Sequence, residues 1–261
     1  MAAVRRLSLL LVLAALLSAC GGGSSQPAAS APAPARDLSA VRSRTVGAGT
    51  AHFTLAIAAR VAGAAVRSNE TGSISFAKRQ AHLYKLLPGG GLPQELILDG
   101  PYTYTNANVD AALHDPTVRP WTKLDIRRLP AAQRNRPDEL EHVRALAYLV
   151  GGVRRARRIG TATVDGAPTT HYRGRVDPDR VVAGTPAAER DGVRTAVRSD
   201  FLGTPFAADF WVDGKGRVRR VVVAYRTPNG GRIEVDGTYS QFGEKVDLDL
   251  PPARSIQEIS P

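Results

Sequence analysis

Apolar and polar residues alternate along most of this chain from about residue 45, and this period of two predicts β-strands. In the run 52–58, for example, Phe53, Leu55 and Ile57 fall on one face. Turn-forming Gly, Pro, Asn and Asp residues separate the runs, and the close spacing predicts antiparallel hairpins. The first block of expected strands is 52–58, 71–76, 81–86, 94–98, 102–105 and 121–124.

Helical spacing replaces alternation in the middle of the chain. A helix is expected to open at Pro137, carry apolar residues on one face and end at Gly151 and Gly152. A second helical stretch is expected at 178–182 and 186–198. Further strands are expected at 157–164, 169–176, 206–212, 218–225 and 232–242. This order predicts an α+β fold in which a single large antiparallel sheet is backed by helices on one face.

The N-terminus has the features of a secretory signal. Arg5 and Arg6 precede the apolar run 7–17, which is shorter than the roughly 20 residues that span a bilayer. The string Leu17-Ser18-Ala19-Cys20 follows and resembles the lipobox of bacterial lipoproteins. That resemblance implies cleavage before Cys20, acylation of its thiol and anchoring of the protein on the extracytoplasmic side of the cell membrane. The alternative is an ordinary cleaved signal in which Cys20, the only cysteine, is incidental.

Composition divides the chain into four parts. Residues 1–19 are the expected signal peptide, and 20–38 are the expected lipidated cysteine and a flexible tether rich in Gly, Ser, Pro and Ala. Residues 39–250 are the expected folded domain, and 251–261 the expected C-terminal tail. A tether of this length has a root-mean-square reach of about 20 Å, which would hold the domain near the bilayer without fixing its orientation.

Basic residues outnumber acidic ones, which gives a formal net charge of +11. Each basic side chain near an anionic membrane surface gains about 1 kcal/mol. No known nucleic-acid motif interleaves these residues with aromatics, so nucleic acid is not an expected partner. The densest basic cluster is either a contact for anionic headgroups or a solvated helix end that complements the helix dipole. Its members are Arg154, Arg155, Arg157 and Arg158.

The sequence contains no recognisable catalytic or metal-binding constellation. Its histidines form no HxH or HExxH pair, and no second cysteine could complete a zinc site. A G-x-S-x-G elbow is absent, and Gly89-Gly90-Gly91 is followed by neither Lys-Ser/Thr nor a helix start. We therefore expect a protein that is not an enzyme and needs no cofactor or metal.

Several strand-and-turn strings, in this order behind a lipobox, resemble the LppX/LprG-type lipoproteins of high-GC Gram-positive bacteria, which share the LolA/LolB-like fold. The strings are 72–76, 121–124, 164–172, 210–220 and 239–243, and the resemblance covers roughly 40–250. It implies a strongly curved half-barrel sheet with helices across its concave face and a hydrophobic cavity between them. It also implies a role in moving lipids or lipoglycans through the envelope, without catalytic residues.

The apolar strand faces would line either such a cavity or a packed core, and alternation does not distinguish the two. The cavity-lining candidates are Phe53, Leu55, Ile57, Ile74, Phe76, Leu83, Leu96, Leu98, Leu146 and Val150. With a cavity, the expected function is binding or transfer of an acylated lipid or lipoglycan by a membrane-anchored monomer. With a packed sheet, the alternative is an anchored interaction or regulatory module.

Overall fold

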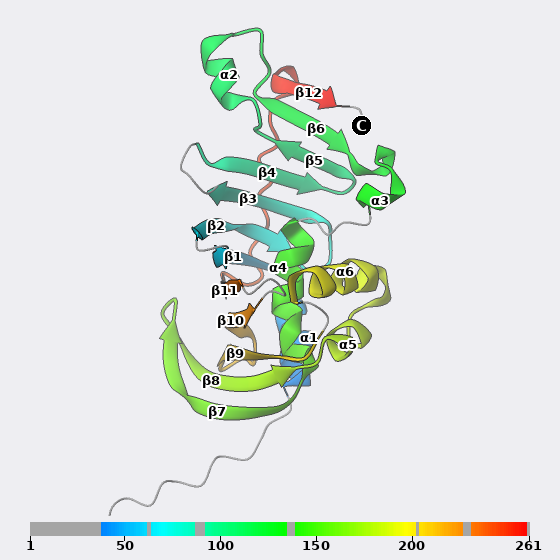
Figure 1. Ribbon diagram of the computed structural model, residues 1–261. Helices are drawn as coiled ribbons and strands as arrows, with labels where there is room; N and C mark the ends of the chain where they lie inside the picture. Colours follow the sequence, from blue (N-terminus) through cyan, green and yellow to red (C-terminus); the bar gives the residue numbers. More distant parts are fainter. Residues whose placement is uncertain are drawn as a thin grey trace, which may run out of the picture. The chain divides into compact units, whose positions relative to one another are not determined.

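The computed structural model describes residues 38–61, 64–86, 92–134, 139–201, 204–226 and 231–259. These residues form one mostly antiparallel sheet with helices against one of its faces (Figure 1). The predicted α+β class with a single large sheet is therefore confirmed. The strands are β1 (Thr50–Val61), β2 (Ala64–Ser75), β3 (Gln80–Leu86), β4 (Gln94–Asp99), β5 (Tyr102–Thr105), β6 (Trp121–Asp125), β7 (Val153–Val164), β8 (Ala167–Val176), β9 (Phe206–Asp213), β10 (Val218–Arg226), β11 (Arg232–Ser240) and β12 (Ile256–Ile259).

The strand order is β12-β6-β5-β4-β3-β2-β1-β11-β10-β9-β8-β7. Hairpins build most of it, and the pairing of β1 with β11 joins the two halves of the sheet. Apart from β12, which runs parallel to β6, the neighbouring strands are antiparallel. Strands β12 and β7 are the two edges, so the arginine cluster of β7 lies on an edge strand.

The helical elements lie between the strands in sequence. They are α1 (Ser39–Val46), α2 (Val109–His114), η1 (Ile126–Arg128), α3 (Ala131–Arg134), α4 (Glu139–Tyr148), η2 (Leu149–Gly152), α5 (Pro178–Ala183), η3 (Ala187–Glu189), α6 (Arg190–Phe201) and η4 (Ala253–Ser255). Helix α4 crosses the central strands, and α1, α5 and α6 lie around it (Figure 1).

Several segments differ from the sequence-based expectation, including Val109–His114, which forms helix α2 where no helix was predicted. Residues Ser39–Val46 form helix α1, a segment for which the pattern predicted no helix. Strand β7 begins at Val153, before the expected start at residue 157, so the whole arginine cluster lies on a strand that directly follows η2. Residues Ile256–Ile259, within the expected tail, form β12 and pair with β6, where Lys123 Nζ lies 3.0 Å from Glu258 Oε1.

Strand register divides the sheet into two faces, because directly paired residues point to the same side. Phe53 pairs with both Gly72 and Tyr239, and all belong to the side covered by the helices, which we call the inner face. Thr54 pairs with Thr71 and Thr238 on the opposite, outer face. The hydrophobic core lies between the inner face and the helices.

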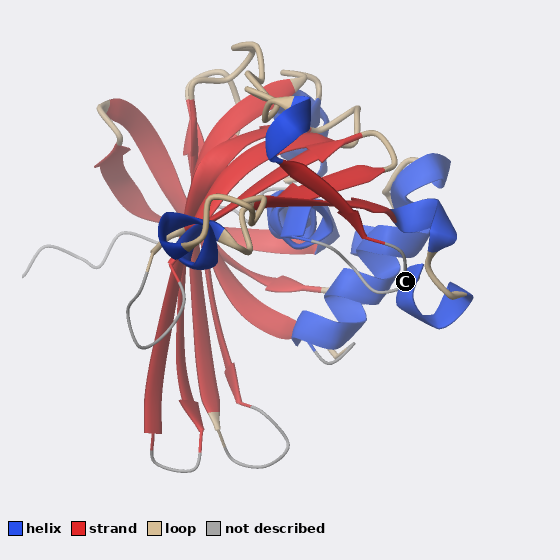
Figure 2. Cartoon of the chain, turned by 90° about the horizontal axis from the view of Figure 1, so that it is seen from above, coloured by secondary structure: helices blue, strands red, loops and turns tan. Residues whose placement is uncertain are grey.

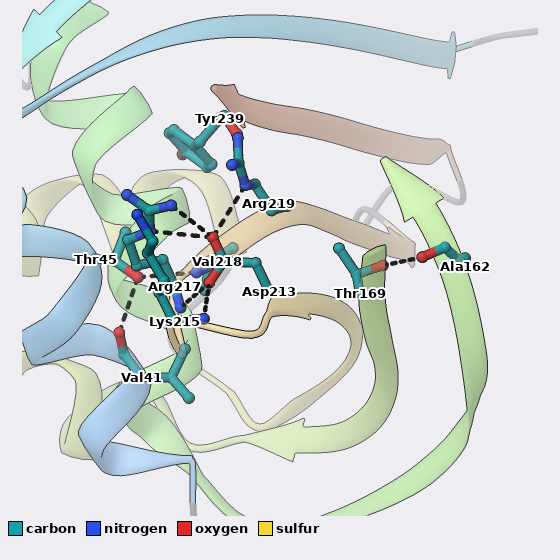
Figure 3. Close-up of polar contacts among 10 residues, drawn as sticks. All are labelled: Val41, Thr45, Ala162, Thr169, Asp213, Lys215, Arg217, Val218, Arg219 and Tyr239. Carbon is teal, nitrogen blue, oxygen red and sulfur yellow. Dashed lines mark hydrogen bonds and ion pairs between the residues drawn. The ribbon is translucent and has the colours of Figure 1, made fainter. Parts of the chain in front are cut away.

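Helix α1 is tied to the turn between β9 and β10 (Figure 3). The Thr45 hydroxyl donates to Val41 O (2.8 Å) and accepts from the backbone N–H of Val218 (3.0 Å). In the same turn the Asp213 carboxylate accepts from the backbone N–H of Arg217 and pairs with the guanidinium groups of Arg217 (2.9 Å) and Arg219 (3.1 Å). Burial raises the pKa of Asp213, but these hydrogen bonds and charges outweigh it and hold the pKa below its usual range.

Candidate functional site

The ten residues expected to line a cavity come together on one side of the sheet. Eight of them are buried members of the hydrophobic core, and the other two, Ile57 and Leu96, are partly buried and pack against it. The structure therefore places these residues together, in the core or packed against it. The packing beneath α4 shows how much space remains for a ligand beside them.

Helix α4 sits in close contact with the sheet at Gly237 of β11. A Cβ atom built on Gly237 would lie 2.3 Å from Leu146 Cδ2, closer than real Cβ contacts allow. Leu55, the β1 partner of Gly237, is buried in the same place. The missing side chain at residue 237 is thus what allows Leu146 to reach the sheet, and the space beneath α4 at this point is filled.

Buried polar side chains hold α4 in this position. The Arg144 guanidinium donates from Nε (3.0 Å) and Nη2 (2.6 Å) to Ser75 O, and Nη2 also donates to Lys78 O. The Tyr239 hydroxyl donates to Val143 O (2.7 Å), and burial raises the pKa of Tyr239. Because a buried donor without its partner is costly, these bonds fix the helix relative to β2 and β11.

Beyond α4, the inner face continues as an apolar surface that is only partly buried. We call Ile57, Val66, Tyr225, Ile233 and Val235 the apolar strip. Ile57 pairs directly with Val235, and Tyr225 with Ile233, so the residues form two adjacent rows across β2, β1, β11 and β10. Val66 is 40% exposed, and the other four are intermediate. In Figure 2 the long strands extend well beyond the helices.

Of the strip, sequence reasoning named only Ile57 as a candidate. Val235, Ile233 and Tyr225 lie in runs that were correctly predicted as strands, but the sequence analysis did not assign them to a face. Alternation does not reveal which strands pair. The pairing of β1 with β11 brings Ile57 next to Val235, although the two residues are separated by more than half of the sequence.

An ion pair lies at the border between the strip and the packed core. Glu70 pairs with Leu55 on the inner face, one row from Ile57, and its carboxylate lies 3.1 Å from Lys85 Nζ. Glu70 is only 5% exposed, so this carboxylate depends on its partner for charge compensation. The Glu70–Lys85 pair therefore lies beside the apolar strip as a polar group that can form hydrogen bonds.

The outer face carries a groove of about 660 Å³ between the tip of the β7–β8 hairpin and the central strands. Its lining includes Thr54 and Thr238, whose hydroxyls are 2.6 Å apart, and the ion pair of Arg220 with Asp236 (2.6 Å). Among the ten cavity candidates only Leu55 contributes to this lining. The groove is therefore distinct from the predicted site.

The four clustered arginines, Arg154, Arg155, Arg157 and Arg158, are exposed on β7. Among the described residues, none of the four forms an ion pair. Arg157 is the direct partner of Arg173, whose guanidinium is bound to Asp209 (2.9 Å) together with His171 (2.7 Å). The Asp209 carboxylate is thus shared between His171 and Arg173.

Two histidines of the sheet have close structural partners. His171 stacks on Trp211 with ring centroids 4.2 Å apart, and His82 Nε2 lies 2.6 Å from Glu95 Oε1. Within the described ranges, no group of three or more His, Cys, Asp or Glu side chains could hold a metal ion. No helix of the same ranges is long and apolar enough to cross a bilayer. Cys20 and the rest of the expected signal and tether lie outside the described residues.

Comparison with known proteins returned no matching family model and no matching curated protein. Solved structures similar to this chain include LprF from Mycobacterium bovis, at 15% identity over 84% of this chain and 98% of that one, with a TM-score of 0.48. The lipoprotein LppX from Mycobacterium tuberculosis matches at 14% identity over 81% and 98%, with a TM-score of 0.47. A LolA superfamily protein from Nitrosomonas europaea matches at 9% identity over 84% and 96%, with a TM-score of 0.29. LppX and the LolA superfamily protein carry the names of the group and the fold that the sequence motifs resemble.

Proposed function

We propose that this protein is a lipid-anchored, non-enzymatic component of the cell envelope that binds an acylated lipid or lipoglycan on the apolar strip. The observation that carries the proposal is the continuation of the core's apolar face beyond α4, where Ile57, Tyr225 and Val235 stay partly exposed while packing against the core. Contiguous exposed apolar surface of this kind marks binding sites on soluble domains.

An acyl chain fits the strip better than the space beneath α4. Leu146 already fills that space over Gly237, whereas a chain laid along Ile57 and Val235 would remove exposed apolar surface from water. Such burial contributes about 0.8 kcal/mol for each methylene group. The Glu70–Lys85 pair at the border would then face the polar end of the ligand.

The test is uptake of a fluorescent long-chain fatty acid and a fluorescent phospholipid by the full chain. The variant Ile57→Asp places a carboxylate in the strip, and we expect its affinity to fall by at least about tenfold, because the charge would have to be buried with the chain. The matched control is Ala58→Asp, an exposed position on the opposite face of the same strand, which should bind as the parent does. Equal uptake by both variants would contradict the proposed site.

The packed core supports a second candidate function, an anchored interaction or regulatory module without a lipid ligand. Eight of the ten expected cavity residues are buried in the core. This candidate predicts that the parent protein itself takes up neither probe, a result that would exclude the first proposal for the ligands tested.

A further inference from the structure

The ends of four central strands carry a row of arginines on the outer face. Arg60 of β1 pairs directly with Arg232 of β11, and Arg232 pairs directly with Arg226 of β10. Arg67 of β2 lies one row nearer the middle of the sheet, opposite Ala58. All four are exposed. We call Arg60, Arg226 and Arg232 the arginine row.

The charges of this row are poorly compensated. Like charges directly opposite each other on neighbouring strands destabilise a sheet, yet three arginines occupy consecutive partner positions. Within the described residues, Arg232 has one carboxylate in reach, Glu234 at 3.5 Å, and both side chains are largely exposed. Arg60 and Arg226 have no ion pair there. An external anion would relieve the repulsion.

The apolar strip lies on the reverse side of the same strand ends. Ala59 of β1, next to Arg60, pairs with both Val66 and Ile233 on the inner face. The ends of β2, β1, β11 and β10 are therefore apolar on one side and cationic on the other. This combination suits a bilayer interface, where apolar side chains enter the acyl boundary and guanidinium groups contact lipid phosphates.

We propose that the ends of these four strands dock onto the surface of an anionic lipid bilayer. When the strip carries no ligand, a soluble polyanion would engage the arginine row and leave Val66 and Ile233 in water, whereas an anionic bilayer covers both sides at once. The inference goes beyond the proposed lipid binding and does not depend on it, because its partner is a membrane surface and not a bound lipid molecule.

The test uses the full chain with Cys20→Ser, so that neither an acyl anchor nor a second thiol interferes. An environment-sensitive fluorophore is attached at Val66→Cys on the strand end or, as a control, at Leu113→Cys on α2, where the native side chain is 70% exposed. Each labelled protein is titrated with vesicles of equal parts phosphatidylglycerol and phosphatidylcholine, and with vesicles of phosphatidylcholine alone.

We expect a blue shift of the Val66→Cys probe with the anionic vesicles only, and none for the Leu113→Cys probe. The triple variant Arg60→Gln, Arg226→Gln and Arg232→Gln should need about 100-fold more anionic lipid for the same shift. Removal of the four β7 arginines, also by Gln, should leave the shift in place. Thermal unfolding of each variant checks that it folds.

Several results would overturn docking by the strand ends. They are no shift at Val66→Cys, an unchanged shift in the triple variant, or loss of the shift only when the β7 arginines are replaced. The triple variant should still take up monomeric fluorescent fatty acid. Docking without uptake would reject the proposed function alone, and uptake without docking would reject this inference alone.

Discussion

At the scale of single residues, one glycine decides how closely the main helix approaches the sheet. Gly237 lies beneath Leu146, and any side chain at residue 237 would collide with it. The sequence places this glycine inside a strand run, where glycine has no side chain to pack and lowers strand propensity. Glycine is required at residue 237 because α4 lies too close to the strand to leave room for a side chain.

We predict that Gly237→Ala destabilises the protein by about 1–3 kcal/mol, the usual cost of forcing extra atoms into a packed core. Thermal or denaturant unfolding measures the change. Gly160→Ala in β7 is the matched control, because a Cβ there meets nothing within 4 Å and the backbone φ of Gly160 lies outside the left-handed region that favours glycine.

Adding Leu146→Ala to Gly237→Ala should remove the collision, so the double variant should lose less stability than the sum of the two single changes. Strict additivity would show that the two residues do not contact each other in this way. A stable Gly237→Ala variant would likewise contradict the filled space beneath α4.

At the scale of elements, the central strands follow from alternation, whereas three segments required tertiary context. Helix α1 buries only Val41 and Thr45 of its own residues, too little for a recognisable helical stripe. Strand β12 is four residues long and exists through its pairing with β6. Strand β7 carries one register shift between Val153 and Ala156, where Arg154 and Arg155 lie, and another between Arg158 and Gly160. These shifts obscure alternation there.

The candidate site, too, depends on tertiary contacts that the sequence pattern does not reveal. Alternation in the strands, with helical spacing at Leu146 and Val150, was sufficient to group the ten candidates, eight of which are buried in the core. The position at which α4 crosses the sheet depends on Gly237, Arg144 and Tyr239, whose contacts join residues far apart in sequence. The border between packed core and exposed strip could therefore be located only with the structure.

Among the described strands, β7 pairs only with β8 and forms one edge of the sheet. Its arginines suit protection of that edge as well as contact with anionic headgroups, the role considered from sequence. Charged side chains prevent one sheet edge from pairing with another. We predict that Arg155→Thr with Arg157→Thr promotes self-association at micromolar concentration, measured by sedimentation velocity. Arg128→Thr, an exposed arginine of η1 outside the strands, is the control. A double variant that sediments as the parent does would leave headgroup contact as the remaining role for these residues.

At the scale of the whole molecule, the account joins an N-terminal anchor to a sheet domain with an exposed apolar strip. We predict that Cys20→Ala releases the protein from the membrane fraction while its unfolding temperature is unchanged, because residue 20 precedes every described element. Fractionation followed by immunoblotting measures the release. A variant that stays in the membrane fraction after cleavage of the signal would contradict the lipid anchor.

The most direct test of the central claim, that the strip binds an acylated ligand, is native mass spectrometry of the full protein purified from a high-GC Gram-positive host. The spectra are recorded before and after organic extraction. We predict an extractable lipid at close to one per chain, in addition to any covalent acyl groups, and its loss in Ile57→Asp. A parent protein that carries no extractable lipid and takes up no added phospholipid or lipoglycan would contradict the claim and favour the packed interaction module.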